Sequence, residues 1–237
     1  MRTPLDQVRF LAASENRVRV LACLCETPAD REEIRERTGV SRPTLSRVLS
    51  DLEARSWITR RGSECEITPL GALLSEEFDA LLDTAETIQK LEGVVDHLPL
   101  DRMDVDLKRL GAATITTPTS ADPTAPVHRA TVLTRETGTL RFLTNGFVPS
   151  IAEAMWRGTV CGCLTVVAVV TGRSIDAILG DPEMTRLTRE TVGSGRAEFY
   201  RYDGPQPHNV AIMDDELAVI MVVDDEGNLR AAIETDD

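Results

Sequence analysis

The chain of 237 residues has little lysine, no long apolar run and an odd number of cysteines. No apolar stretch reaches the roughly 18 residues of a membrane span, and the N-terminal segment is amphipathic and unlike a signal peptide. Five cysteines do not suggest the paired framework of an extracellular protein. We therefore expect no membrane association and a cytoplasmic location.

The sequence also lacks the usual signatures of catalysis. It has no nucleophile elbow, no P-loop and no complete dinucleotide fingerprint. The three histidines are far apart in sequence, without the spacing of paired metal ligands (His97, His128 and His208). Cys23 and Cys25 point to nearly opposite sides of a predicted helix. We expect no metal, no cofactor and no enzymatic activity; an enzyme with an unrecognised site is the alternative.

Charge is distributed unevenly along the chain. Residues 1–62 contain twelve arginines and nine acidic residues, a net charge of +3. Because the whole chain has a net charge of −13, the remaining residues carry −16. Such an asymmetry favours contact with phosphate by the N-terminal part alone. Lys90 and Lys108 are the only lysines, and an acidic, lysine-poor surface is typical of adaptation to high salt. The acidic runs at 101–106, 214–215 and 224–225 are accordingly interpreted as solvated side chains.

Residues 31–68 have the pattern of a winged helix-turn-helix. A helix at 17–26, with Ser14 as its expected N-cap, precedes a short helix at 30–38. Gly39 stands where a helix end favours a left-handed residue, and Ser41 is the expected N-cap of the next helix. This order of parts builds a probe for the DNA major groove.

The helix expected at 42–56 carries this interpretation. Leu45, Val48, Leu49 and Leu52 recur at helical spacing and must face the core. The opposite face presents arginines and small hydroxylated side chains, which can bind base edges and phosphates. We predict DNA contacts from Ser41, Arg42, Pro43, Thr44, Ser46, Arg47 and Ser50. The alternative is an ordinary amphipathic helix with a solvated arginine face.

A small β-hairpin follows this helix. Residues 57–60 and 65–68 are expected as strands around a turn at 61–64. Arg60, Arg61 and Ser63 are then placed at the tip of a wing, where they would reach the DNA backbone.

These segments resemble archaeal winged-helix transcription regulators. The resemblance covers about residues 10–75 and lies in RTGVSRPTLSR at 37–47, LEARSWI at 52–58 and ITPLG at 67–71. It implies a DNA-binding domain, but it specifies neither an operator nor a subfamily.

Residues 70–98 have a long apolar stripe at steps of three and four. A stripe of this length is typical of a helix paired with another surface. Homodimerisation through this helix would match two half-sites about one DNA turn apart. Packing against the protein's own second domain is the alternative.

Residues 110–237 alternate between strand and helix patterns and end in a meander. Strands are expected near 112–117, 139–143, 164–170, 197–201, 209–213, 217–223 and 229–234. Helices are expected near 126–136, 149–158, 174–179 and 182–192. This order predicts an α/β sheet with an antiparallel edge.

Two stretches of this second domain look like versions of one unit. RFLTNG at 141–146 leads to a helix with Ser150 at its start, and VVTGR at 169–173 leads to one with Ser174 at its start. Parallel strands would open both loops at one sheet edge, where ligand sites usually form. We predict an anionic effector at Thr144, Asn145, Thr171 and Arg173. The alternative is that the serines are ordinary caps and Arg173 is a surface residue.

Cys161 and Cys163 are predicted on a strand, where residues two apart face the same way. Their Cα separation would then lie at the outer limit of disulfide geometry. A redox switch is the less favoured interpretation of this pair.

As a whole, the layout resembles TrmB-like archaeal regulators and those with a methanogenesis-regulator-type C-terminal domain. The resemblance of the second domain rests on VAIMDDELAVI at 210–220 and DDEG at 224–227. It implies an effector or oligomerisation domain without catalysis, and no sugar-binding motif accompanies it.

The sequence thus predicts a mixed α+β and α/β protein in three parts. Residues 1–69 form a winged helix-turn-helix domain, 70–109 a connecting and dimerisation helix with a linker, and 110–237 an α/β effector or oligomerisation domain. The predicted function is a homodimeric, sequence-specific regulator that binds double-stranded operator DNA and a small-molecule effector. The alternative is a winged-helix module that binds another protein and no DNA.

Overall fold

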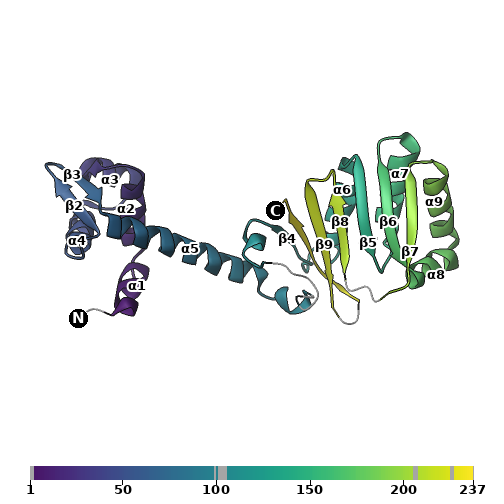
Figure 1. Ribbon diagram of the computed structural model, residues 1–237, viewed down its shortest axis with the longest axis horizontal. Helices are drawn as coiled ribbons and strands as arrows, with labels where there is room; N and C mark the ends of the chain where they lie inside the picture. Colours follow the sequence, from purple (N-terminus) through teal and green to yellow (C-terminus); the bar gives the residue numbers. More distant parts are fainter. Residues whose placement is uncertain (1–2, 99, 101–105, 205–207, 225–226, 237) are drawn as a thin grey trace. The chain divides into compact units, whose positions relative to one another are not determined.

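Helices and strands account for most of the residues described by the computed structural model, which are 3–98, 100, 106–204, 208–224 and 227–236. The chain divides into two units, Met1–Ala85 and Glu86–Asp237 (Figure 1). The first is mainly helical and the second contains a large sheet, as the sequence predicts. The acidic runs at 101–106 and 224–225 lie partly outside the described residues. No described helix has the length and apolar character needed to cross a bilayer.

The first unit has the element order of a winged helix. It contains α1 (Pro4–Ala12), α2 (Glu15–Glu26), β1 (Ala29–Asp30), α3 (Arg31–Thr38), α4 (Arg42–Glu53), β2 (Ile58–Arg61), β3 (Glu64–Ile67) and most of α5 (Pro69–Leu91). The strands form a sheet in the order β1-β3-β2, in which Ala29 pairs with Cys65. Strand β1 was not predicted, because a two-residue strand is defined only by its pairing with a distant segment.

Local signals set most helix ends in this unit. Asp30 begins α3 with a capping box, in which its carboxylate accepts hydrogen bonds from the backbone N–H groups of Glu32 and Glu33. Gly39 ends α3 with φ of 69°, the left-handed conformation expected there. Ser14 and Ser41 occupy N-cap positions, but neither side chain makes the expected capping hydrogen bond.

The helix expected to reach residue 56 ends earlier, at Glu53. Ser56 has a positive φ of 59°, and the Trp57 N–H donates to the Leu52 carbonyl oxygen at 3.1 Å. This turn directs Trp57 and Ile58 into the core, where both are almost fully buried. Burial of the Trp57 indole therefore ends α4 at Glu53, although the sequence pattern predicts a helix that continues to residue 56.

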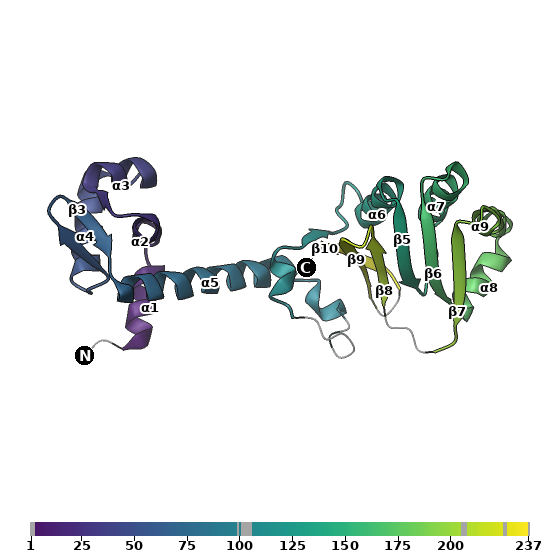
Figure 2. The ribbon, with the colours of Figure 1, turned by 45° about the horizontal axis from the view of Figure 1, so that its top comes forward.

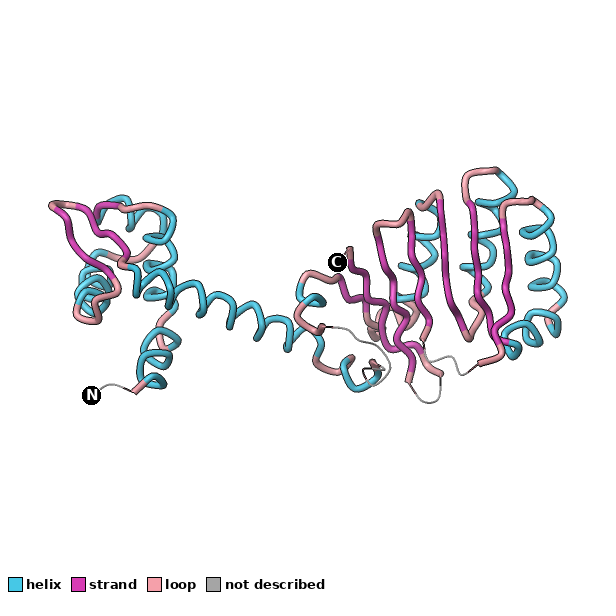
Figure 3. The backbone as a smooth tube through the Cα atoms, viewed as in Figure 1, coloured by secondary structure: helices cyan, strands magenta, loops and turns pink. Residues whose placement is uncertain are grey.

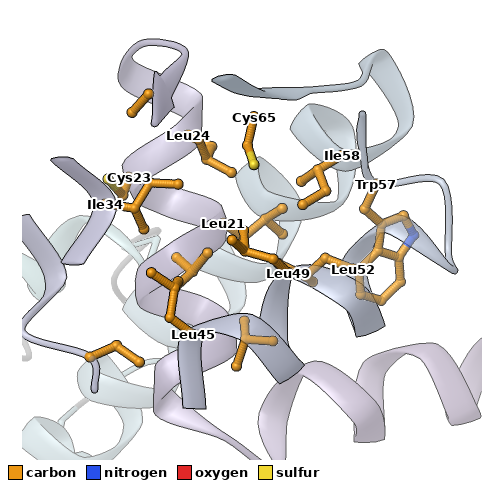
Figure 4. Packing of buried hydrophobic residues seen from close by; sticks show 14 of the residues in the cluster. Leu21, Cys23, Leu24, Ile34, Leu45, Leu49, Leu52, Trp57, Ile58 and Cys65 are labelled. Carbon is orange, nitrogen blue, oxygen red and sulfur yellow. The ribbon is translucent and has the colours of Figure 1, made fainter. Parts of the chain in front are cut away.

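One apolar core holds the first unit together (Figure 4). The inner faces of α2, α3 and α4 meet the residues that begin the wing, and the side chains labelled in Figure 4 point toward one another. On α1, Phe10 lies between two guanidinium groups, with the Cζ atoms of Arg17 and Arg55 at 3.8 and 3.2 Å from its ring centroid. These cation–π contacts attach α1 to the rest of the unit.

The long helix α5 ends at Leu91 and does not continue to residue 98 as expected. Gly93 has a φ of +78°, and a short 3-10 turn at Val95–His97 follows it. Leu74 and Phe78 pack on the first unit's core. Other apolar side chains of the helix are exposed, namely those of Leu70, Leu73, Leu81, Leu82 and Ile88.

The second unit contains a seven-stranded sheet in the order β4-β10-β9-β8-β5-β6-β7 (Figure 3). The strands are β4 (Thr114–Thr116), β5 (Thr139–Thr144), β6 (Thr165–Thr171), β7 (Ala197–Tyr202), β8 (Asn209–Met213), β9 (Leu217–Val223) and β10 (Leu229–Thr235). Strands β5, β6 and β7 are parallel. The remaining pairs are antiparallel, which confirms the predicted antiparallel edge.

A layer of helices lies beside the sheet (Figure 2). It contains α6 (Ala125–Glu136), which precedes β5, and α7 (Pro149–Cys161), which connects β5 to β6. It also contains α8 (Gly172–Gly180) and α9 (Pro182–Gly193), which connect β6 to β7. On β9, Val219 belongs to the core beneath these helices. Its neighbours Ile220 and Val222 belong to a second core on the opposite face, built with residues from 91–113 such as Leu110. A short 3-10 turn at Arg109–Gly111 lies in that covering segment.

The turn between β8 and β9 is held by a carboxylate. Met213 pairs with Leu217, so three residues connect the strands, and Asp214 and Asp215 both have positive φ, at 53° and 60°. Asp214 accepts hydrogen bonds from the backbone N–H groups of Gly138 and Thr139 at 2.9 and 2.8 Å. The exposed carboxylate therefore links two segments that are distant in sequence.

Candidate nucleic-acid interface and ligand pocket

Helix α4 separates its side chains into two faces. Leu45, Val48, Leu49 and Leu52 are at most 3% exposed. The predicted DNA-contacting residues lie on the other side of the helix: Ser41, Arg42, Pro43, Ser46, Arg47 and Ser50 are exposed, and Thr44 is half-buried. The helix therefore presents a polar surface that the rest of the first unit leaves open.

Most arginines of this surface are paired with neighbouring carboxylates. A guanidinium nitrogen of Arg42 lies 3.3 Å from a carboxylate oxygen of Glu32. Arg60 pairs with Glu53 at 3.1 Å and Arg61 with Glu66 at 3.0 Å. Arg47 differs, because it has no hydrogen-bond or ion-pair partner within the described part of the chain.

The start of α4 is electrostatically open. Its first turn contains no acidic residue, and the Ser41 hydroxyl donates to Thr44 Oγ1 at 3.0 Å instead of accepting from the backbone. By contrast, Asp30, Glu32 and Glu33 surround the start of α3. The partial positive charge of a helix N-terminus is therefore available at α4 and neutralised at α3.

The wing has a shorter turn than expected. Strands β2 and β3 pair from Ile58 opposite Ile67 to Arg61 opposite Glu64, which leaves Gly62 and Ser63 as the turn. Gly62 has φ of +64°, a conformation that L side chains rarely adopt. Arg60 and Arg61 therefore lie on β2, and Ser63 alone of the three predicted wing residues lies in the turn.

A cavity of about 590 Å³ lies between the helix layer and the centre of the large sheet. Its walls come from α6, α7 and strands β5, β8 and β9, and most of its lining is apolar, including Val127, Phe142, Phe147, Ile151, Met155, Ala211 and Met221. This volume lies in the range of pockets that hold small molecules. The cavity lies where the parallel strand β5 meets the antiparallel strand β8.

Polar groups gather at one part of this cavity. Thr144, Asn145 and Arg173, three of the four residues proposed from the sequence as effector contacts, line it. Thr144 Oγ1 and the Asn145 backbone N–H both lie 2.9 Å from Asn209 Oδ1. Arg173 is exposed and has no hydrogen-bond or ion-pair partner among the residues that the structure describes. A cation is thus available to a ligand beside an apolar chamber.

The fourth predicted residue, Thr171, has a structural position. It is the last residue of β6 and the N-cap of α8, where its hydroxyl accepts a hydrogen bond from the Ser174 N–H at 3.2 Å, and it is outside the cavity lining. The N-cap of α7 is Val148, and Ser150 Oγ lies 3.0 Å from Thr131 Oγ1. The expectation of serine caps is therefore wrong for both helices.

The contributions of Asn209 and of α6 to the cavity were not predicted from the sequence. Asn209 begins β8, which pairs with β5 from a position more than sixty residues later in the chain. The local pattern contains no signal for this pairing.

The described residues contain no group of three or more His, Cys, Asp or Glu side chains that could hold a metal ion.

Two family models match separate parts of the chain. Residues 5–90 match the HVO_A0261 N-terminal domain, and residues 123–237 match the middle domain of the methanogenesis regulatory protein FilR1. No curated protein matches the sequence.

Several solved structures are distantly similar to the chain. TrmBL2, an archaeal chromatin protein, has 15% identity over 99% of this chain and 92% of its own, with a TM-score of 0.36. Ligand-free NadR has 23% identity over 41% of this chain and 80% of its own, with a TM-score of 0.31. Nuc, a phospholipase D family member from Salmonella typhimurium, has 12% identity over 53% of this chain and 84% of its own, with a TM-score of 0.40.

The family models, and not these distant structures, carry the assignment. The matched residues include α4, the wing and nearly all of α5 in one model, and the whole cavity lining in the other. The chain is thus similar to archaeal winged-helix transcription regulators, with an HVO_A0261-type N-terminal domain and a methanogenesis-regulator-type domain after it.

Proposed function

We propose that this protein is a sequence-specific transcription regulator that binds double-stranded DNA with α4 in the major groove. The exposed polar face of α4, with an unpaired Arg47 among the described residues, is the observation that carries this proposal. A helix can lie deep in the groove when the side chains on its outer face are short, as Ser46 and Ser50 are.

The residues on the exposed face of α4 are proposed to make two kinds of contact, with base edges and with phosphate. Thr44, Ser46 and Arg47 are proposed to contact base edges, because hydroxyl and guanidinium groups match the donor and acceptor pattern of the major groove. The open N-terminus of α4, with Ser41, Arg42 and Pro43, is proposed to receive a phosphate. Ser50 lies farther along the same face.

The wing is proposed to bind the DNA backbone through Arg60, Arg61 and Ser63. In the free protein the two arginines pair with Glu53 and Glu66. These pairs are solvent-exposed, and exposed ion pairs contribute about 1 kcal/mol or less. A phosphate can therefore replace the carboxylates at small cost.

The experiment compares wild-type protein with Arg47→Ala and Arg61→Ala. The specific duplex is the fragment with the highest occupancy in genome-wide footprinting, and the reference is a scrambled duplex of the same composition. We expect Arg47→Ala to lose about tenfold or more of the preference for the specific duplex, the scale of one base contact. We expect Arg61→Ala to weaken binding to both duplexes similarly and to lower the salt dependence by about one counterion.

Arg19→Ala is the matched control, since Arg19 is an exposed arginine of α2 paired with Glu15. It should leave both affinities unchanged. Wild-type protein that retards no duplex at any salt concentration would contradict DNA binding and would favour the alternative of a protein-binding winged helix. Unchanged discrimination in Arg47→Ala would show that the assigned face of α4 is wrong.

We further propose that the protein is a homodimer formed through α5. Every residue from Asp79 to Asp83 is exposed, including Leu81 and Leu82, and Ile88 farther along is 66% exposed. A helix that leaves an apolar stripe in water is stabilised by a second copy of the same stripe. Two copies would also present two α4 helices to a pair of half-sites.

The cavity of the second unit is proposed to bind an effector and not to catalyse a reaction. Its apolar walls and the available Arg173 suit a ligand with an apolar body and an anionic group, such as an amphipathic carboxylate. Such an effector changes DNA affinity only if it binds the DNA-competent arrangement more or less tightly than the alternative.

A further inference from the structure

Cys161 and Cys163 form a pair of adjacent thiols at the end of α7. The helix ends at Cys161, and Gly162 follows with φ of +82°, so the chain reverses direction. The backbone N–H groups of Cys163 and Leu164 both donate to the Gly158 carbonyl oxygen, at 2.9 and 3.0 Å. The two sulfur atoms lie 2.7 Å apart as a result. The prediction that both cysteines lie on a strand is wrong, and the end of α7 brings them closer than a strand would.

The surroundings of this pair are those of reactive thiols. Both cysteines are exposed. The guanidinium of Arg196 lies over the turn, since its Nε would be 3.5 Å from a Cβ added at Gly162. Reactive cysteines occur in exposed positions near positive charge.

The two thiols differ in acidity. A hydrogen bond from Cys163 is the main factor that lowers the pKa of Cys161, and the charge of Arg196 acts in the same direction. The same interaction raises the pKa of Cys163. Elsewhere in the chain, burial raises the pKa of Cys23 and of Cys65. Cys161 is thus the thiol that ionises more readily, and the adjacent Cys163 is the thiol that can resolve an oxidised intermediate.

We propose that Cys161 and Cys163 are a reversible dithiol that hydroperoxides convert into an intramolecular disulfide. The sulfur of the Cys161 thiolate attacks one peroxide oxygen, the O–O bond breaks, and the departing hydroxide takes a proton to become water. Cys161 is then a sulfenic acid.

The sulfur of Cys163 next attacks the Cys161 sulfur and expels hydroxide, which combines with the proton of the Cys163 thiol to form a second water. Two thiols and one hydrogen peroxide give one disulfide and two waters. The two sulfur atoms are already adjacent, so the disulfide forms without a large movement of the backbone. A dithiol reductant reverses the reaction by thiol–disulfide exchange.

The test uses the full-length protein, reduced and desalted, with hydrogen peroxide as the oxidant. Thiols are counted after denaturation, and peptides containing residues 161–163 are analysed by mass spectrometry without reduction. The wild type should fall from five free thiols to three, with the loss of two hydrogens located in this peptide. Dithiothreitol should restore all five.

Cys25→Ser is the matched control, because Cys25 is also exposed but belongs to another helix. It should still lose two thiols. Cys163→Ser should stop at a sulfenic acid on Cys161 that dimedone traps, and Cys161→Ser should lose the rapid reaction. Retention of five thiols in the wild type, equal thiol loss in Cys161→Ser, or disulfides only between chains would overturn the proposal.

Discussion

Arg129 and Glu234 form a two-bond ion pair between α6 and β10. Arg129 Nε and a terminal guanidinium nitrogen donate to the two carboxylate oxygens of Glu234 at 2.8 and 2.7 Å. The Glu234 side chain is only 5% exposed, whereas that of Arg129 is 40% exposed. The pair holds the first helix of the second unit against a strand that the chain adds last.

Arg129→Ala should lower the free energy of unfolding of the second unit by about 2–3 kcal/mol. The substitution leaves the Glu234 carboxylate buried without its counter-charge, and the partial exposure of Arg129 keeps the loss below that of a fully buried pair. Urea unfolding followed by circular dichroism measures the change. Adding Glu234→Gln to Arg129→Ala should recover part of the loss, and equal stability of all three proteins would contradict a role for the pair.

Gly71→Ala should destabilise the first unit by about 2–3 kcal/mol, the scale of overpacking. A Cβ at this position would lie 2.0 Å from the carbonyl oxygen of Trp57, so α5 would have to move away from the wing. Helix propensity alone predicts the opposite sign, because alanine favours a helix interior by about 1 kcal/mol over glycine. Thermal unfolding distinguishes the two, with Gly180→Ala as the control, since nothing lies within 4 Å of an added Cβ there. A stabilised Gly71→Ala variant would refute the packing argument.

Asp214→Asn should reduce both stability and its dependence on acid pH. Hydrogen bonds to its carboxylate, above all from the Thr139 backbone, lower the pKa of Asp214 below that of an unfolded aspartate. Its contribution is therefore complete above the unfolded pKa of about 3.9 and disappears as the pH falls through the lower folded value. Asparagine tolerates the positive φ at this position.

The expected loss at neutral pH is about 1 kcal/mol, because an amide accepts these hydrogen bonds more weakly than a carboxylate does. The difference from wild type should shrink as the pH falls below about 4. Unfolding midpoints across that pH range measure it, and Asp79→Asn on α5 controls for the loss of one surface charge. A difference that stays constant down to the lowest pH would contradict the assignment.

Leu81→Glu should convert the proposed dimer into a monomer. Leu81 is 51% exposed in the single chain, so the new carboxylate is solvated in a monomer but buried against its own copy in a dimer. Sedimentation equilibrium measures the change, and circular dichroism should show unchanged unfolding of each unit. Glu77→Gln on the same helix is the control. A wild type that is monomeric at every concentration, or a dimeric Leu81→Glu, would exclude this interface.

Arg173→Ala should lower the affinity for amphipathic carboxylates by about tenfold, the value of one charge-assisted contact. A set of fatty and aromatic carboxylates, each paired with its methyl ester, tests the charge and the apolar body separately by calorimetry. Arg157→Ala on α7 is the control, since that arginine pairs with Glu153 on the helix surface. Equal affinity of wild type and Arg173→Ala for a carboxylate would argue against the assigned anionic contact.

Locally determined features could be predicted from the sequence. The two faces of α4 follow from leucine spacing, and the turn at Gly39 follows from the one residue type that adopts it readily. Both are decided within a few residues. The early end of α4 could not be predicted, because burial of Trp57 in the core overrides the polar pattern of residues 54–56.

Features that depend on pairing between segments far apart in the chain could not be predicted from the sequence. Thr144 and Asn145 could be placed at a sheet edge, but Asn209, which binds both, becomes visible only when β8 pairs with β5. Thr171 has a side chain that could bind a ligand, but it serves as the N-cap of α8. The adjacency of Cys161 and Cys163 likewise depends on where α7 ends.

The antiparallel strand β8 beside the parallel strand β5 has a consequence for how the protein matures. The cavity floor combines β5 with strands that emerge from the ribosome some seventy or more residues later. Pairing across such a separation is slow to form, and a chain synthesised only as far as β7 can possess all three parallel strands and still lack part of the cavity floor. The proposed effector, by binding only the finished cavity, would stabilise the complete fold by mass action. Its presence in the cell would then influence how much of the protein survives proteolysis.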